Sequence, residues 1–266
     1  MQSGRILAVA VAIVLLAAAG ITLTLASDAS KPPNAAGQAR HSGPGAPAQN
    51  RLGPVLLVPG YGGESGSLDT LASRIRANGR PATVLQLPGS GTGSLVADAV
   101  ALNSAVAQAK RNGAPSVDVI GYSAGGVVAL LWARHDDGAS RARRIVTLGA
   151  PFHGSELAAA ALALAPGQCP VACRQLVPGS PLLASLDAAS GIGLPPWLSL
   201  WTADDEVVTP PASARLAGAI DVPVQTVCPA LAVSHTDMPS NPAVINMVLE
   251  AISSSPLTRP TTAACG

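Results

Sequence analysis

Aromatic and charged residues are scarce in this sequence of 266 residues. Phe, Trp and Tyr make up 2% of it, and Asp, Glu, Lys and Arg together make up 12%. The 16 basic and 15 acidic side chains nearly balance, so no excess of positive charge is available to bind a phosphate backbone. Few rings are available for base stacking or cation–π contacts. We therefore expect no nucleic-acid partner.

Cysteine and histidine are also sparse. The chain has only four of each, and they do not follow the spacing of metal ligands, so we expect no metal site and no cofactor. What the chain has instead is aliphatic and small: 48% of it is hydrophobic, and it contains 27 glycines and 24 prolines. That is ample apolar material for the core of a folded domain.

The amino terminus carries one long apolar run, Ile6 to Ala26, directly after Arg5. This run is longer than the apolar core of most signal peptides and long enough to span a bilayer. No clear cleavage site with small residues follows it. Residues 1–27 are therefore interpreted as a signal peptide or a retained membrane anchor, with residues 6–26 as the tether in the second case. We expect a protein that is secreted or held on the extracytoplasmic face of the membrane.

Residues 28–52 are rich in Pro, Gly and Ala, a composition that predicts a disordered linker. From residue 53 to 266, short apolar runs alternate with helical patterns. This alternation predicts an α/β domain with a mostly parallel central sheet of about six strands, flanked by helices. The expected strands lie at Leu52–Pro59, Thr83–Leu87, Val117–Ile120, Ile145–Leu148, Trp197–Trp201 and Val222–Val227. The arginines just before Ile145 are interpreted as a solvated surface.

Residues 152–194 interrupt the alternation, and we call them the cover insertion. They contain an apolar helical stretch, Glu156 to Ala165, then a segment rich in Cys, Pro and Gly, and a short helical piece, Leu182 to Ala188. An insertion at this point of an α/β chain lies over the carboxyl end of the sheet, where ligands bind. A cover for the site and a simple packed connection both remain open.

Ser123 is the residue whose surroundings point most clearly to chemistry. It lies in Gly121-Tyr122-Ser123-Ala124-Gly125, a GxSxG pattern, between an apolar strand and an apolar helical run. Such a turn from strand to helix forces the serine into a strained conformation and exposes its hydroxyl. The flanking glycines let the two backbones approach. This pattern predicts a nucleophilic serine; an ordinary helix cap is the alternative.

A serine hydroxyl needs a base, and the base needs a carboxylate to orient it. Among the histidines, His235 is favoured because it precedes the last helix, at the same end of the sheet as Ser123. Of the alternatives, His41 lies in the linker and His135 lies at the far end of the helix after Ser123. His153 follows an expected strand. Asp205 is favoured over Asp204 as the acid. The order Ser123, Asp205, His235 is that of the α/β-hydrolases.

Five motifs together carry a family resemblance: GYSAGG, LVPGYGG (Leu57 to Gly63), VTLGAPFHGS (Val146 to Ser155), TADDEVVTP (Thr202 to Pro210) and the Ser234-His235 loop. Over Leu52 to Ile252 the chain resembles the secreted bacterial lipases and esterases of the α/β-hydrolase superfamily, namely the class 2 or Bacillus-type lipases and their actinobacterial relatives. The resemblance implies an oxyanion hole made by the backbone N–H groups of Tyr61 and Ala124. Pro59-Gly60 replaces the His-Gly usual in these enzymes.

The expected activity is that of a serine carboxylic ester hydrolase acting on lipid esters through an acyl-enzyme. An acyltransferase or a polyester hydrolase with the same triad, or a non-catalytic surface binding protein on this fold, are the alternatives. We expect a monomer. For four cysteines in an exported chain, Cys169–Cys173 and Cys228–Cys265 is the favoured disulfide pairing, with free thiols as the alternative.

Overall fold

The computed structural model describes residues 46–63, 65–136, 138–189 and 193–266. The signal peptide or anchor expected over residues 1–27, its apolar segment 6–26 and residues 28–45 of the expected linker lie outside these ranges, as does His41. In the ranges described, no helix has both the length and the apolar character needed to cross a membrane.

Six strands form one sheet in which every neighbouring pair is parallel, in the order β2-β1-β3-β4-β5-β6. This confirms the predicted fold class. The register sets Val58 of β1 beside Gly121 of β3, and Tyr122 of β3 beside Leu148 of β4. The segments that follow these three strands therefore start at the same edge of the sheet. The strands are β1 (Val55–Val58), β2 (Ala82–Val84), β3 (Val117–Tyr122), β4 (Ala142–Leu148), β5 (Trp197–Trp201) and β6 (Ile220–Pro223).

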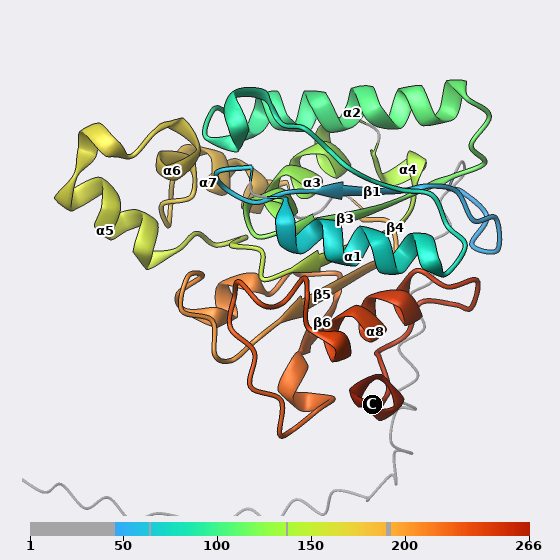
Figure 1. Cartoon of the computed structure of the whole chain (residues 1–266). Helices are drawn as coiled ribbons and strands as arrows, with labels where there is room; N and C mark the ends of the chain where they lie inside the picture. The colour runs from blue at the N-terminus through green and yellow to red at the C-terminus, as the bar shows by residue number, and fades with distance from the viewer. Residues whose placement is uncertain (1–45, 64, 137, 190–192) are drawn as a thin grey trace, which may run out of the picture. The chain divides into compact units, whose positions relative to one another are not determined.

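Helices cover both faces of the sheet (Figure 1). Successive side chains of a strand point to opposite faces, so Val55 and Leu57 of β1 join a core with α1 and α8, while Leu56 and Val58 join a core with α2 and α3. The helices are α1 (Gly66–Ala77), α2 (Leu95–Arg111), α3 (Ala124–His135), α4 (Gly138–Arg141), α5 (Glu156–Leu164), α6 (Val171–Gln175), α7 (Pro181–Ala188) and α8 (Pro242–Ala251).

The last strand begins and ends earlier than the apolar run predicts. The predicted range, Val222 to Val227, is wrong. The strand β6 covers Ile220–Pro223, and Val224–Thr226 form a 3₁₀ turn. Pro223 explains the stop, because proline has no N–H to continue a strand ladder.

The prediction that the arginines before Ile145 form a solvated surface is wrong. Arg143 and Arg144 belong to β4 and are fully buried. Arg143 donates to both carboxylate oxygens of Asp118 in β3, and Arg80 donates to the same carboxylate at 2.6 Å. Arg143 also donates to the Ile252 carbonyl, just after α8, at 2.7 Å. A guanidinium can be buried when its donors find acceptors in this way.

The described end of the expected linker packs beside these arginines, at the amino edge of the sheet, where β3 and β4 begin. Gln49 donates to the Arg143 carbonyl at 3.1 Å and accepts a hydrogen bond from Arg144 at 3.1 Å. Arg143 and Arg144 thus connect residues before β1 to residues after α8. We call Arg80, Asp118, Arg143 and Arg144 the basal cluster.

Candidate active site

Ser123 is the single residue between the end of β3 and the start of α3. Its backbone has φ 52° and ψ −126°, in the left-handed half of the map that side chains avoid. Glycines make the turn possible: a Cβ on Gly121 would lie 2.6 Å from the Gly125 carbonyl oxygen, and a Cβ on Gly125 2.2 Å from that of Val58. The strained turn expected from the GxSxG pattern is therefore present.

His235 and Asp205 meet Ser123 at the carboxyl edge of the sheet. The Ser123 hydroxyl lies 3.0 Å from Nε2 of His235, and Nδ1 of His235 lies 2.8 Å from Oδ2 of Asp205. His235 comes from the loop before α8 and Asp205 from the loop after β5; both side chains are buried. One continuous hydrogen-bond chain thus joins three residues from distant parts of the sequence.

The loop around Asp205 fixes its carboxylate. Oδ1 accepts hydrogen bonds from the backbone N–H groups of Val207 at 3.0 Å and Val208 at 2.7 Å, which leaves Oδ2 to His235. Gly149, after β4, packs directly against this pair: a Cβ there would lie 3.0 Å from Nδ1 of His235 and 3.1 Å from Oδ2 of Asp205. Its φ of 55° also favours glycine.

Of the two expected oxyanion donors, Ala124 directly follows Ser123 and Tyr61 lines the same cavity as Ser123. Ala124 is the first residue of α3, and no hydrogen bond among the described residues uses its N–H or that of Tyr61. The chain before Tyr61 runs against the serine, since a Cβ on Gly60 would lie 3.0 Å from the Ser123 Cβ. Gly63 closes a turn by donating to the Gly60 carbonyl at 3.1 Å. Main-chain contacts therefore support this loop, where the sequence has Pro59-Gly60 in place of His-Gly.

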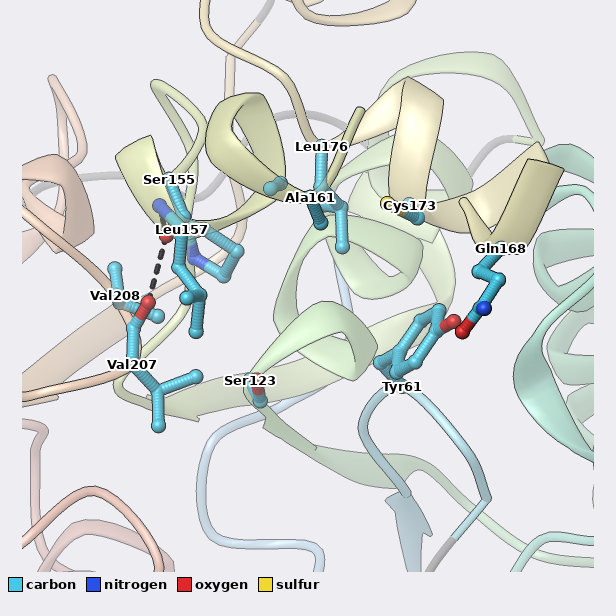
Figure 2. A pocket seen from close by; sticks show the side chains of 12 residues that line it. Tyr61, Ser123, Ser155, Leu157, Ala161, Gln168, Cys173, Leu176, Val207 and Val208 are labelled. Atoms are coloured by element: carbon cyan, nitrogen blue, oxygen red, sulfur yellow. Dashed lines mark hydrogen bonds between the residues drawn. The ribbon is translucent and has the colours of Figure 1, made fainter. Parts of the chain in front are cut away.

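A cavity of about 240 Å³ opens beside Ser123. Figure 2 shows Leu157 and Ala161 of α5 above the serine, Val207 and Val208 on one side, and the Tyr61 ring next to Gln168 on the other. The lining is predominantly apolar and consists of Tyr61, Ser123, Pro151, Ser155, Leu157, Ala158, Ala161, Gln168, Cys173, Leu176, Val207 and Val208.

No protein-family model and no curated protein sequence matches the chain. Solved structures do resemble it. Lipase B of Aspergillus fumigatus superposes with a TM-score of 0.67 at 19% identity, over 80% of this chain and 55% of that one. A mature Bacillus licheniformis lipase superposes with a TM-score of 0.54 at 21% identity, over 69% of this chain and 84% of that one. An alpha/beta hydrolase from a lagoon-sediment metagenome superposes with a TM-score of 0.52 at 18% identity, over 74% of this chain and 89% of that one. The chain has the α/β-hydrolase fold. It spans about half the length of the Aspergillus protein.

Within this α/β-hydrolase fold, the other candidate residues lie apart from Ser123. The His153 ring is half exposed, with Nδ1 3.7 Å from a carboxylate oxygen of Asp187. His135 is exposed at the end of α3. Asp204 is exposed and accepts a hydrogen bond from Gln225 at 3.2 Å. Among the described residues, no group of three or more His, Cys, Asp or Glu side chains could hold a metal ion.

The cover insertion combines both roles that the sequence left open. Residues of α5 and α6 line the cavity, whereas Leu183 and Leu186 of α7 are buried in the core. No residue of α5 is buried. The disulfide Cys169–Cys173 joins the segment after α5 to helix α6. The second disulfide, Cys228–Cys265, links the carboxyl terminus to the segment after β6.

Three residues near the site were not identified from the sequence: Gly149, Tyr122 and Glu206. The Tyr122 hydroxyl donates to the His235 carbonyl at 3.2 Å, and the Glu206 carboxylate accepts from the His235 N–H at 3.1 Å. A glycine directly after a strand, inside a turn, was a usable signal for Gly149. No sequence pattern marks Tyr122 or Glu206, because each binds the backbone of a residue far away in the chain.

Proposed function

We propose that this protein is a serine carboxylic ester hydrolase that acts on lipid esters, with Ser123 as nucleophile, His235 as base and Asp205 as its orienting acid. The observation that carries the proposal is the hydrogen-bond chain from the Ser123 hydroxyl through the His235 imidazole to Asp205. A serine held in a strained turn at a helix N-terminus, with a base within 3.0 Å, has the components needed for acyl transfer.

In the proposed reaction, His235 takes the proton from Ser123 as the serine oxygen attacks the ester carbonyl. The negative oxygen of the tetrahedral intermediate accepts hydrogen bonds from the N–H groups of Tyr61 and Ala124. His235 then gives the proton to the leaving alcohol, and the acyl group remains on Ser123. Water, deprotonated by His235, releases the acid by the same steps. Each oxyanion donor contributes roughly 10²–10³ in rate.

The lining of the cavity supports an apolar acyl group as the substrate. Leu157, Ala161 and Val207 present hydrocarbon next to Ser123. Apolar side chains of α5 are also exposed: Leu157 is 52% exposed and Leu164 86% exposed. Exposed apolar surface beside a reactive group fits a substrate that is itself a lipid.

We also propose that the protein works as a monomer outside the cytoplasm. Two disulfides fit an oxidising compartment. The resemblance to lipases and esterases agrees with the proposed ester hydrolase, but it establishes only the fold.

The test is hydrolysis of p-nitrophenyl esters, from acetate to palmitate, by the oxidised full-length protein and its Ser123→Ala variant. We expect the highest turnover with medium or long acyl chains and a loss on the order of 10⁶ in kcat for the variant. Tyr61→Ala is expected to lose far less, because the donor is the main chain. Turnover that survives Ser123→Ala would refute the mechanism. A folded protein without turnover on any chain would favour the non-catalytic binding protein.

Adding an alcohol or a soluble polyester to the same assay separates the close variants. Ester transfer to the alcohol in preference to water would indicate an acyltransferase. Release of monomers from the polyester at rates above those for simple esters would indicate a polyester hydrolase.

A further inference from the structure

His235 is held by its backbone as well as by its side chain. Its carbonyl oxygen accepts a hydrogen bond from the Tyr122 hydroxyl at 3.2 Å, and its N–H donates to a Glu206 carboxylate oxygen at 3.1 Å. The imidazole meanwhile contacts Asp205 and Ser123. Both polar backbone groups of the proposed base are therefore fixed by side chains from distant segments, the end of β3 and the loop after β5.

The two backbone contacts come from residues adjacent to the rest of the triad. Tyr122 directly precedes Ser123, and Glu206 directly follows Asp205. The position of the His235 backbone is thus tied to the same strand end that carries the serine and to the same loop that carries the acid. His235 itself lies in a loop without regular structure between the 3₁₀ turn after β6 and α8. Its own loop contributes only a 3.3 Å hydrogen bond from the Met238 N–H to its carbonyl.

The Tyr122 side chain is suited to act as a permanent donor. Burial and the nearby carboxylates of Asp205, Glu206 and Asp237 raise the pKa of Tyr122 above its usual range, so the hydroxyl keeps its proton. The ring also packs on the imidazole, with 5.2 Å between ring centres and an interplanar angle of 33°. Tyr122 therefore restrains His235 at two points, its carbonyl and its ring.

We propose that Tyr122 and Glu206 are positioning residues that hold the His235 backbone so that Nε2 stays within reach of the Ser123 hydroxyl. This inference rests on the proposed function, since it assigns the residues to the same reaction. Neither residue is hydrogen-bonded to the Ser123 hydroxyl or to an imidazole nitrogen of His235. They act through the placement of the base, and misplacement of a catalytic group by about 1 Å can cost on the order of 10²-fold in rate.

The test compares Tyr122→Phe, Glu206→Ala and the double variant with the wild-type protein. We expect kcat for a p-nitrophenyl ester to fall about tenfold in each single variant and about a hundredfold in the double variant, with KM unchanged. Glu206→Gln keeps an oxygen that can accept the His235 N–H, so it is expected to recover most of the loss seen in Glu206→Ala. Equal losses in the Gln and Ala variants would mean that Glu206 acts through charge and would overturn its positioning role.

Ser199→Ala is the matched control for stability. Like Tyr122→Phe, it removes a buried hydroxyl that donates to a backbone carbonyl, here that of Ala214 at 2.7 Å. Ser199 lies within β5 and forms no hydrogen bond with His235. We expect it to lower the thermal midpoint while changing kcat by less than about twofold. Unchanged kcat in Tyr122→Phe, or a loss that Ser199→Ala reproduces, would overturn the inference.

A second reaction separates this inference from the proposed function. Diethyl p-nitrophenyl phosphate reports an activated serine by releasing p-nitrophenolate once, as the Ser123 oxygen bonds to phosphorus. If wild-type protein reacts but hydrolyses no ester, the proposed substrate is wrong, and slower phosphorylation in Tyr122→Phe still supports the positioning role. If folded wild-type protein does not react at all, Ser123 is not activated and the positioning role falls with the mechanism.

Discussion

The two edges of the central sheet use buried polar groups in different ways. At the amino edge, where the strands begin, the basal cluster pairs Asp118 with Arg80 and Arg143. Further guanidinium donors of this cluster bind backbone carbonyls after α8. At the carboxyl edge, Asp205 and His235 are equally well partnered, but their chain ends on the Ser123 hydroxyl at a cavity. The N–H groups of Tyr61 and Ala124 beside it bind nothing among the described residues.

The two edges differ in which polar groups are available for chemistry. A fully hydrogen-bonded ion pair holds segments together but has no capacity left for a substrate. The carboxyl edge instead keeps unpaired donors and a strained serine in place, and stability gained elsewhere must offset this strain. Substitutions at the two edges should therefore separate activity from stability.

Among the substitutions that compare the two edges, Asp205→Asn at the carboxyl edge should have the largest effect. The amide cannot fix the imidazole tautomer that accepts the serine proton, so kcat should fall on the order of 10⁴-fold with little change in the thermal midpoint. Asp204→Asn is the matched control, because Asp204 is the exposed neighbour. Ester hydrolysis of both variants is the measurement; a greater loss in Asp204→Asn would reassign the acid.

At the amino edge, Asp118→Ala should have the opposite profile. It leaves Arg143 buried without its carboxylate partner, which typically costs about 3–5 kcal/mol of unfolding free energy. Asp118 precedes Ser123 by five residues of extended strand, roughly 16 Å, so kcat of the folded fraction should stay within about twofold. Urea unfolding measures the loss, and Asp69→Ala, at an exposed position of α1, provides the control. A stable Asp118→Ala with reduced kcat would contradict the separation of the edges.

The sequence predicted the carboxyl edge better than the amino edge. Ser123 lies in a local pattern of strand, glycine turn and helix. The loops after the expected strands suggested Asp205 and His235 as its partners, and the structure brings the three together. The buried arginines were not predictable in this way. Charged residues are normally exposed, and the acceptors that bury Arg143 lie at Asp118 and Ile252, far away in the sequence.

Two residues around the candidate site were equally hard to predict from the sequence. Tyr122 was visible only as the variable position of a GxSxG pattern, and Glu206 only as the neighbour of two aspartates. Both side chains bind the His235 backbone. Because every residue has a backbone carbonyl and nearly every residue has an N–H, the sequence does not reveal which backbone groups will be bound. Patterns thus predict the reactive groups, whereas the groups that place them depend on tertiary structure.

Gly149→Ala should disturb the carboxyl edge through a single methyl group. The new Cβ would lie 3.0 Å from Nδ1 of His235 and 3.1 Å from Oδ2 of Asp205, so the imidazole or the carboxylate must shift and the contact between them is disturbed. We expect kcat to fall on the order of 10²-fold. Gly79→Ala is the matched control, because Gly79 also has positive φ, 80°, but has open space around its Cβ position. Both variants should lose about 1 kcal/mol in urea unfolding from backbone strain, and only Gly149→Ala should lose activity.

The smallest expected effect concerns a third buried carboxyl group, Asp98 of α2. Unlike Asp118 and Asp205, neither of its oxygens has a hydrogen-bond partner among the described residues, and burial raises the pKa of Asp98 to about 6. The folded state thus holds this proton at pH values where the unfolded chain has lost it, so stability falls as pH rises from about 4 to 6 and stays lower above that range.

Asp98→Asn removes this titration and should raise the free energy of unfolding by about 2 kcal/mol at pH 8. At pH 4 the folded state keeps this proton and the unfolded chain has lost only about half of it, so the gain should be well below 1 kcal/mol. Urea unfolding at the two pH values measures the difference, with the exposed Asp69→Asn as control. An equal gain at both pH values would mean that packing around α2, and not ionisation, limits stability there. A gain confined to pH 8 would show that a buried carboxylate needs the partners that Asp118 and Asp205 have.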